Sequence, residues 1–141
     1  MNDTLKDQLR QAYNAKAAER NTRETPAWRQ ELRENFAAML HQEKKQTLLE
    51  LGAGPGIDGR FFQDQGFDVL CTDLSPEMVR LCQEKGLKAK LMDNTRLDDL
   101  PPASFDAVYA MNTLLHLPKD DLPAVLAAIQ TVLKPDGLFF M

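Results

Sequence analysis

Four apolar segments of the sequence are each followed directly by residues whose types suit ligand binding. They are the glycine-rich residues 52–56, Asp73, the pair Asp93 and Asn94, and Asn112. Glycines let a ligand approach the backbone closely, and carboxylate or amide groups form hydrogen bonds to polar ligands. Because such residues recur after successive apolar segments, they indicate one ligand site assembled from several parts of the chain.

The glycine-rich stretch fits two different patterns. Gly52, Gly54 and Gly56 form G-x-G-x-G, whereas Gly54, Gly56 and Gly59 form G-x-G-x-x-G, which is the dinucleotide fingerprint. In both patterns the next residues are helical in character, and a helix N-terminus suits a carboxylate or phosphate. The two registers imply different cofactors, so the glycines alone leave the cofactor open.

Three further positions each allow a functional and a structural interpretation. Asp73 can accept both hydroxyls of a ribose, or it can cap the next helix, although Ser75 is better placed for capping. Asp93 and Asn94 can meet an adenine edge, or they can simply mark a turn. His116 has a side chain suited to general-base catalysis, or it can be packed among its apolar neighbours.

Strand-like and helix-like patterns alternate along the chain after residue 46. We predict helices over residues 3–20, 25–44, 57–65, 75–86 and 122–133, and strands over 47–51, 67–72, 87–91 and 105–111 and from 138. Helix 25–44 is predicted to begin at a Thr25 cap and to bury Trp28 and Phe36. Alternating strands and helices predict an α/β fold with a parallel sheet, whose ligands bind beyond the carboxyl ends of the strands.

Composition excludes several functional classes. The chain has 141 residues and a formal net charge of −4, which argues against an electrostatic nucleic-acid binder. It contains no apolar run long enough for a membrane span and no signal-peptide core. Its two cysteines, Cys71 and Cys82, form no metal-binding pair. They predict buried thiols, a cytoplasmic protein and no metal site.

Several stretches in a fixed order resemble class I S-adenosylmethionine-dependent methyltransferases, particularly small-molecule enzymes of the ubiquinone/menaquinone type. They are "LLELGAGPG", "CTDLSPEMV", "LMDN", "SFDAVYAMNTLLHL" and "LKPDGLFF". The resemblance implies a Rossmann-like doubly wound sheet of strand order 3-2-1-4-5 over residues 47–141, preceded by a helical extension or lid over residues 1–46. It also selects the G-x-G-x-G register that begins at Gly52.

The resemblance further implies a role for individual residues. Around the methionine part of the cofactor it places Glu50, Gly52, Ala53, Gly54 and Gly56. Asp73 would hold the ribose, with Leu74 and Met78 nearby, and Asp93 and Asn94 would read adenine. Met111 would offer its backbone to the methionine amino group, and Tyr13 would close over the carboxylate. Arg20 stands where many relatives have a second tyrosine.

The implied function is methyl transfer from S-adenosylmethionine to a small molecule, with S-adenosylhomocysteine as the product and His116 as the candidate base. No Asn-Pro-Pro-Tyr-like tetrapeptide follows the fourth strand, which argues against nucleic-acid amines or a protein amide as acceptor. The alternatives are a non-catalytic cofactor-binding fragment and an NAD-dependent oxidoreductase. We also expect a domain truncated after the fifth strand, with self-association through the open edge of strand four or five.

Overall fold

The computed structural model describes residues 2–111 and 113–141, so Asn112 lies outside the described residues. Its helices are α1 (Asp3–Thr22), α2 (Ala27–Gln42), α3 (Ile57–Asp64), α4 (Pro76–Glu84) and α5 (Leu122–Val132). Its strands are β1 (Thr47–Leu51), β2 (Asp68–Asp73), β3 (Lys88–Leu91), β4 (Phe105–Tyr109) and β5 (Leu133–Phe140). Three short 3₁₀ helices lie in the connections: η1 (Leu97–Asp99), η2 (Leu114–His116) and η3 (Lys119–Asp121).

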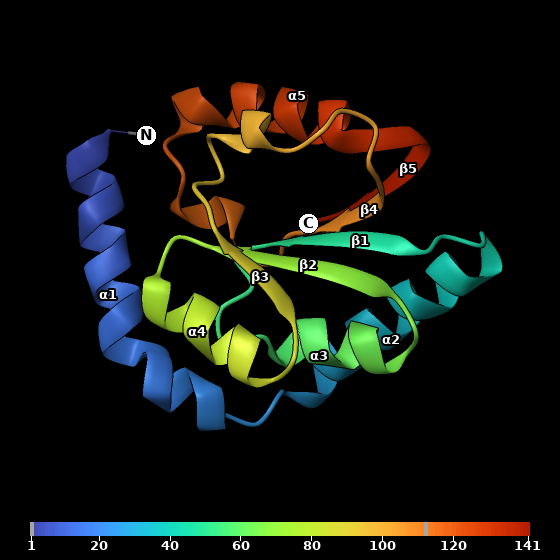
Figure 1. Cartoon of the computed structure of the whole chain (residues 1–141), viewed down its shortest axis with the longest axis horizontal. Coiled ribbons are helices and arrows are strands. Elements are labelled where there is room, and N and C mark those ends of the chain that lie inside the picture. The colour runs from blue at the N-terminus through green and yellow to red at the C-terminus, as the bar shows by residue number, and fades with distance from the viewer. Residues whose placement is uncertain (1, 112) are drawn as a thin grey trace.

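The strands form one parallel sheet in the order β3-β2-β1-β4-β5. Helix α5 covers one face, helices α2, α3 and α4 cover the other, and α1 lies across one end of the molecule (Figure 1). This arrangement confirms the predicted α/β class, the Rossmann-like doubly wound sheet and its strand order. It brings the carboxyl ends of β1, β2 and β4 together, which is where such sheets bind ligands.

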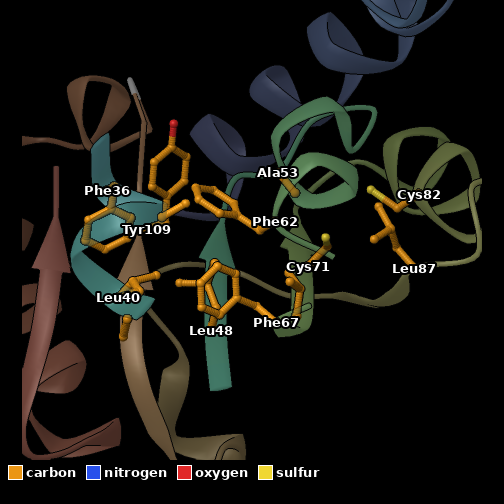
Figure 2. Close-up of a cluster of buried hydrophobic side chains, with 13 residues drawn as sticks. Phe36, Leu40, Leu48, Ala53, Phe62, Phe67, Cys71, Cys82, Leu87 and Tyr109 are labelled. Carbon is orange, nitrogen blue, oxygen red and sulfur yellow. The ribbon is translucent and has the colours of Figure 1, made fainter. Parts of the chain in front are cut away.

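The central strand β1 supplies both halves of the hydrophobic core. Leu48 packs with the side chains of α2 and α3, whereas Leu49 and Leu51 pack with those of α5. Successive side chains of a strand point to opposite faces, so a strand covered on both sides reads as a nearly continuous apolar run. Figure 2 shows the first half, in which Phe36, Phe62 and Tyr109 lie together beside Leu48.

Helix α2 buries a different stripe from the one predicted. Its buried apolar residues are Phe36, Ala37 and Leu40, whereas the side chain of Trp28 is 55% exposed, and Leu32 and Met39 are also exposed. The prediction that Trp28 belongs to the core is therefore wrong. The inward face of the first turns is taken instead by arginines, which bind a buried aspartate described below.

Several predicted element boundaries also differ from the structure; strand β4, for example, ends at Tyr109 rather than at residue 111. Helix α2 has Pro26 at its N-cap and no side-chain capping hydrogen bond, so Thr25 is not the cap. Strand β5 begins at Leu133 rather than at residue 138, and its pairing with β4 shifts register between Phe105 and Ala107. By contrast, Ser75 caps α4 as predicted, since its hydroxyl accepts a hydrogen bond from the Met78 N–H at 3.3 Å.

The two edges of the sheet differ in character. Edge strand β3 carries the exposed lysines Lys88 and Lys90, a common protection against pairing with another chain. Strand β5 is the other edge, and β4 lies between β1 and β5. Within the described ranges, 2–111 and 113–141, β4 is therefore paired on both sides, and β5 is paired with β4 alone.

Candidate functional site

A cavity of about 250 Å³, here called the main cavity, lies at the carboxyl end of the sheet. Residues that follow β1, β2, β3 and β4 contribute to its wall, together with α1. Of the predicted site residues, the wall includes Tyr13, Gly52, Asp73, Leu74, Asp93, Asn94, Met111 and His116. The structure thus brings eight of the thirteen predicted positions into one cavity.

Asp73, the last residue of β2, is held rigidly at the cavity wall. Its Oδ2 accepts a hydrogen bond from the Gly54 N–H at 2.9 Å, and its Oδ1 accepts one from the Ser75 N–H at 2.9 Å. Burial raises the pKa of Asp73, although these backbone hydrogen bonds and the charge of Arg20 oppose that effect. A carboxylate has about four acceptor positions, so Asp73 retains capacity for ligand hydroxyls.

Asp93 lies beyond the end of β3, at the side of the cavity nearest the start of α1. Its Oδ1 accepts hydrogen bonds from the N–H and hydroxyl of Thr95, at 2.9 and 2.8 Å. Its Oδ2 lies 2.6 Å from the Nζ of Lys6 in α1. Burial alone would raise the pKa of Asp93, but Lys6 and Thr95 together lower it, so the carboxylate is ionised at neutral pH.

On the opposite side of the cavity, the segment after β4 approaches both α1 and the glycines. The His116 ring lies edge-on to the Tyr13 ring, with 5.9 Å between centroids. The Thr113 hydroxyl donates to the Leu51 carbonyl at 2.9 Å. A Cβ added at Gly52 would lie 2.4 Å from the Thr113 Oγ1, so a side chain at position 52 would collide with this segment.

The other five predicted residues are not on the wall of the main cavity. Gly56 caps α3 with φ +90°, and an added Cβ there would meet Leu87 and Cys82. Met78 is fully buried in a small cluster under α1. Ala53 faces a neighbouring cavity, Gly54 reaches the site through its bond to Asp73, and Glu50 lies in the buried polar network described next.

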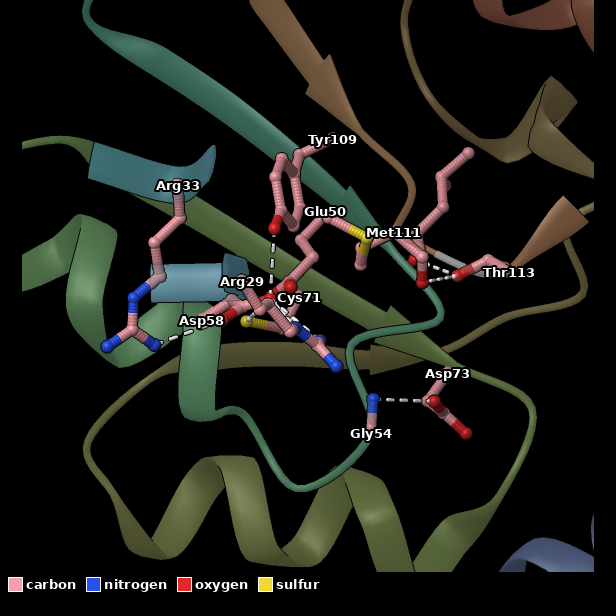
Figure 3. A network of polar contacts seen from close by, with 11 residues as sticks. Arg29, Arg33, Glu50, Gly54, Asp58, Cys71, Asp73, Tyr109, Met111 and Thr113 are labelled. Atoms are coloured by element: carbon pink, nitrogen blue, oxygen red, sulfur yellow. Dashed lines mark hydrogen bonds and ion pairs between the residues drawn. The ribbon is translucent and has the colours of Figure 1, made fainter. Parts of the chain in front are cut away.

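Asp58, in the first turn of α3, is the centre of that network (Figure 3). Its Oδ2 accepts hydrogen bonds from Arg29 Nε and Nη2, at 3.1 and 2.8 Å, and from the Tyr109 hydroxyl at 3.0 Å. Its Oδ1 accepts one from Arg33 Nη1 at 3.1 Å. The network therefore joins α2, α3 and β4 immediately below the glycine-rich loop.

Glu50 lies beside this network and is buried. The Cys71 thiol donates to its Oε1 at 3.6 Å. Burial, followed by the charge of Asp58, raises the pKa of Glu50 well above its ordinary value. Cys71 and Cys82 are free and buried, as predicted. Glu50 therefore lies in the buried network rather than on the wall of the main cavity.

The sequence prediction missed the arginines of the site. Arg20, Arg23 and Arg29 line the main cavity and also a neighbouring one of about 80 Å³, here called the side cavity. Arg29 binds Asp58 and Arg23 binds Glu19, whereas the guanidinium group of Arg20 forms no hydrogen bond or ion pair within the described part of the chain. Arg29 and Arg33 lie, at spacings of three or four residues, on the face of α2 that carries the buried Phe36 and Leu40, but Trp28 and Leu32 also lie at helical spacing from Phe36, so no signal in the sequence separated the two faces.

The described residues contain neither a metal-binding cluster nor a membrane-spanning helix. Among residues 2–111 and 113–141, no group of three or more His, Cys, Asp or Glu side chains is placed to hold a metal ion. Within the same residues, no helix combines the length and apolar character needed to cross a membrane.

The sequence of the sheet region matches a known family. Residues 48–137, more than half of the chain, match the family model described as "Methyltransferase domain". The chain belongs to this methyltransferase family. The predicted resemblance to class I S-adenosylmethionine-dependent methyltransferases is thereby confirmed.

Individual relatives agree with the family match. The chain is 33% identical over 100 residues to the ubiquinone biosynthesis O-methyltransferase of Xylella fastidiosa. This match covers 67% of this chain and 40% of the relative. The chain thus spans well under half the length of this curated relative. It is also 29% identical over 133 residues to an uncharacterized methyltransferase of Schizosaccharomyces pombe, covering 90% of this chain and 49% of that protein.

Solved structures show the same fold. A 1,6-didemethyltoxoflavin-N1-methyltransferase from Burkholderia thailandensis, bound to 1,6-didemethyltoxoflavin and S-adenosylhomocysteine, is 30% identical with a TM-score of 0.68. That match covers 93% of this chain and 59% of the neighbour. Magnesium protoporphyrin IX methyltransferase from Synechocystis, at 17% identity and a TM-score of 0.73, shares the fold, covering 92% of this chain and 72% of the neighbour.

Proposed function

We propose that this chain binds S-adenosylmethionine in the main cavity and transfers its methyl group to a small molecule. The observation that carries the proposal is the meeting of Gly52, Asp73 and Asp93 at one cavity in a methyltransferase domain. Each lies beyond a different strand, which spreads polar contacts along an elongated ligand. The neighbour bound to S-adenosylhomocysteine supports the same cofactor.

The residues of the cavity fit the parts of that cofactor. The Asp73 carboxylate, fixed by two backbone N–H groups, accepts the ribose hydroxyls. Asp93 accepts from the exocyclic amine of adenine, and Asn94 and Leu74 flank the base and ribose. Gly52 leaves the backbone bare beside the methionine part, and Met111 and Tyr13 complete that side.

The cofactor also carries a carboxylate, for which Arg20 is the best partner. Its guanidinium lies over the glycine loop, since Nη2 is 2.9 Å from the position a Gly54 Cβ would take. It has no hydrogen bond or ion pair among the residues that the structure describes, and Arg29 stands beside it in both cavities. Guanidinium groups bind carboxylates with strong, charge-assisted hydrogen bonds.

The competing dinucleotide register receives less support from the geometry. In that register Gly56 would lie against a pyrophosphate, but a Cβ at Gly56 would meet Leu87 and Cys82 instead of the main cavity. Gly52, which only the methyltransferase register includes, lines the cavity. We therefore favour S-adenosylmethionine over a nicotinamide dinucleotide.

The chemistry required of the protein is modest. A bound sulfonium supplies an already activated methyl group, so the chain's own residues mainly position the acceptor in line and exclude water. His116, at the wall of the cavity, is placed to accept a proton from an acceptor that must lose one. The acceptor is proposed to be a small molecule, and the enzyme is proposed to be cytoplasmic and not to bind nucleic acid.

Two experiments test this function. Isothermal calorimetry should show binding of S-adenosylhomocysteine and no comparable binding of NADH. The reverse result would favour an NAD-dependent oxidoreductase instead. Transfer of an isotopically labelled methyl group is then measured against a panel of small phenols, amines and carboxylic acids. Cofactor binding without transfer to any acceptor would favour a non-catalytic binding module.

A further inference from the structure

The carboxylate proposed to read adenine is already contacted by the protein at both of its oxygens. Asp93 Oδ1 accepts two hydrogen bonds from Thr95, which fills both of its acceptor positions. Asp93 Oδ2 is a buried atom that forms no well-aligned hydrogen bond with the described residues, and it lies 2.6 Å from the ammonium group of Lys6. Oδ1 therefore has no acceptor position left, and Oδ2 is closed to a ligand by its burial while Lys6 stays in place.

We propose that Lys6 is an autoinhibitory latch, which holds the start of α1 closed over Asp93 until the adenine base of the cofactor displaces it. The inference rests on the proposed function, in which Asp93 accepts a hydrogen bond from the exocyclic amine. The amine and the ammonium group compete for the same oxygen, so cofactor binding and closure of the first turns of α1 oppose one another.

The surroundings of Lys6 allow it to leave. The side chain of Asp3, one turn earlier, lies 3.8 Å from Lys6 Nζ and offers the released ammonium group another partner in solvent. Arg10 and Arg96 line a third cavity together with Lys6 and Asp93. Each is paired with an aspartate, Asp7 and Asp98 respectively, so neither competes with the adenine amine for Asp93.

The remainder of α1 is fastened independently of Lys6. Arg10 Nε donates to the Leu74 carbonyl at 2.9 Å. Ala17, supported by Tyr13, packs against Met78 and Leu81 of α4. Release of Lys6 therefore frees the first turns of the helix while Tyr13 stays at the main cavity.

The test compares two lysines of the same helix. Lys6→Met removes the latch, and Lys16→Met alters an exposed lysine elsewhere on α1. We expect Lys6→Met to bind S-adenosylhomocysteine about threefold to tenfold more tightly than the wild type in calorimetry, in line with one partly buried ion pair. Lys16→Met should match the wild type. Unchanged or weaker binding by Lys6→Met would overturn the latch.

Two further arms show whether Lys6 acts through Asp93. In an Asp93→Asn background, Lys6→Met should no longer improve binding, because the competition has been removed. In the wild type, amide hydrogen exchange of residues 3–10 should become faster when S-adenosylhomocysteine binds, whereas slower exchange would contradict displacement. Failure of the wild type to bind S-adenosylhomocysteine would overturn the proposed function as well. Binding that Lys6→Met does not improve would overturn the latch alone.

Discussion

Asp73 is the residue on which cofactor binding should depend most, because a buried carboxylate faces the proposed ribose position. Asp73→Ala removes charge-assisted hydrogen bonds, each contributing about 1.5–3 kcal/mol. Since about 1.4 kcal/mol is one decade, affinity for S-adenosylhomocysteine should fall more than tenfold in calorimetry. Thermal unfolding serves as the control for folding, and affinity within twofold of the wild type would exclude the ribose role.

The same residue predicts a pH dependence of binding. Burial raises the pKa of Asp73, so its carboxylate gains a proton at a higher pH than an ordinary aspartate does. A protonated Asp73 accepts fewer hydrogen bonds, and affinity should therefore weaken as the pH falls, beginning above the ordinary aspartate range. Asp93, whose pKa is lowered, stays charged throughout this window. If affinity declines with falling pH in the wild type but not in Asp73→Ala, the pH dependence arises from protonation of Asp73.

Arg20 should discriminate between ligands with and without a carboxylate. Arg20→Met keeps the apolar stem and removes the charge, so affinity for S-adenosylhomocysteine should fall about tenfold or more. Affinity for 5′-methylthioadenosine, which lacks the amino-acid part, should stay unchanged. Arg23→Met is the matched variant, because Arg23 lines the same cavities but is paired with Glu19. Equal losses for both ligands would point to a structural role for Arg20.

His116 is the only candidate base on the cavity wall that the sequence identified. His116→Ala should lower methyl transfer about a hundredfold or more for an acceptor that must lose a proton. Affinity for the cofactor should stay unchanged, because none of the proposed cofactor contacts uses the His116 side chain. Near-normal turnover in His116→Ala would indicate that the protein accelerates transfer by positioning the acceptor alone, without a general base.

At the scale of elements, the junction of α2, α3 and β4 depends on Asp58. Asp58→Ala leaves two arginines and the Tyr109 hydroxyl without their acceptor, which should destabilise the fold by about 3–5 kcal/mol in urea unfolding. Asp64→Ala on the same helix is the control. Its side chain is 59% exposed in its pair with Arg60, against 1% for Asp58, so its loss should be below about 1 kcal/mol.

The elements and their order could be predicted from the sequence, because β1 and β4 are short apolar runs separated by helical patterns. The glycines, Asp73 and Asp93 could be predicted as site residues, since each follows a strand. What could not be predicted is which stripe of α2 faces inward. Trp28 and Leu32 are apolar at helical spacing. Arg29 and Arg33 nevertheless face the core, because both form ion pairs with the buried carboxylate of Asp58 in α3. Such a partner is distant in sequence and has no periodic signature.

At the scale of the whole molecule, exposed apolar side chains on α2 predict association between copies. Trp28, Leu32 and Met39 are exposed, and Phe36 of the same helix packs against Phe140 on the open edge strand β5. We expect sedimentation velocity to show concentration-dependent association that Trp28→Glu weakens. Leu126→Glu, on the exposed side of α5, is the control. A monomer at all concentrations would contradict this prediction.

The Asp58 junction also constrains how the protein can change over evolutionary time. Replacement of Asp58 alone leaves two guanidinium groups without their acceptor, and replacement of either arginine leaves the buried carboxylate with fewer donors, so each single step lowers stability. Neutral drift at positions 29, 33, 58 and 109 should therefore be slow and should proceed as concerted exchanges. Among homologous sequences, these four positions are expected to be inherited as one covarying unit, while the exposed position 31 of α2 varies freely.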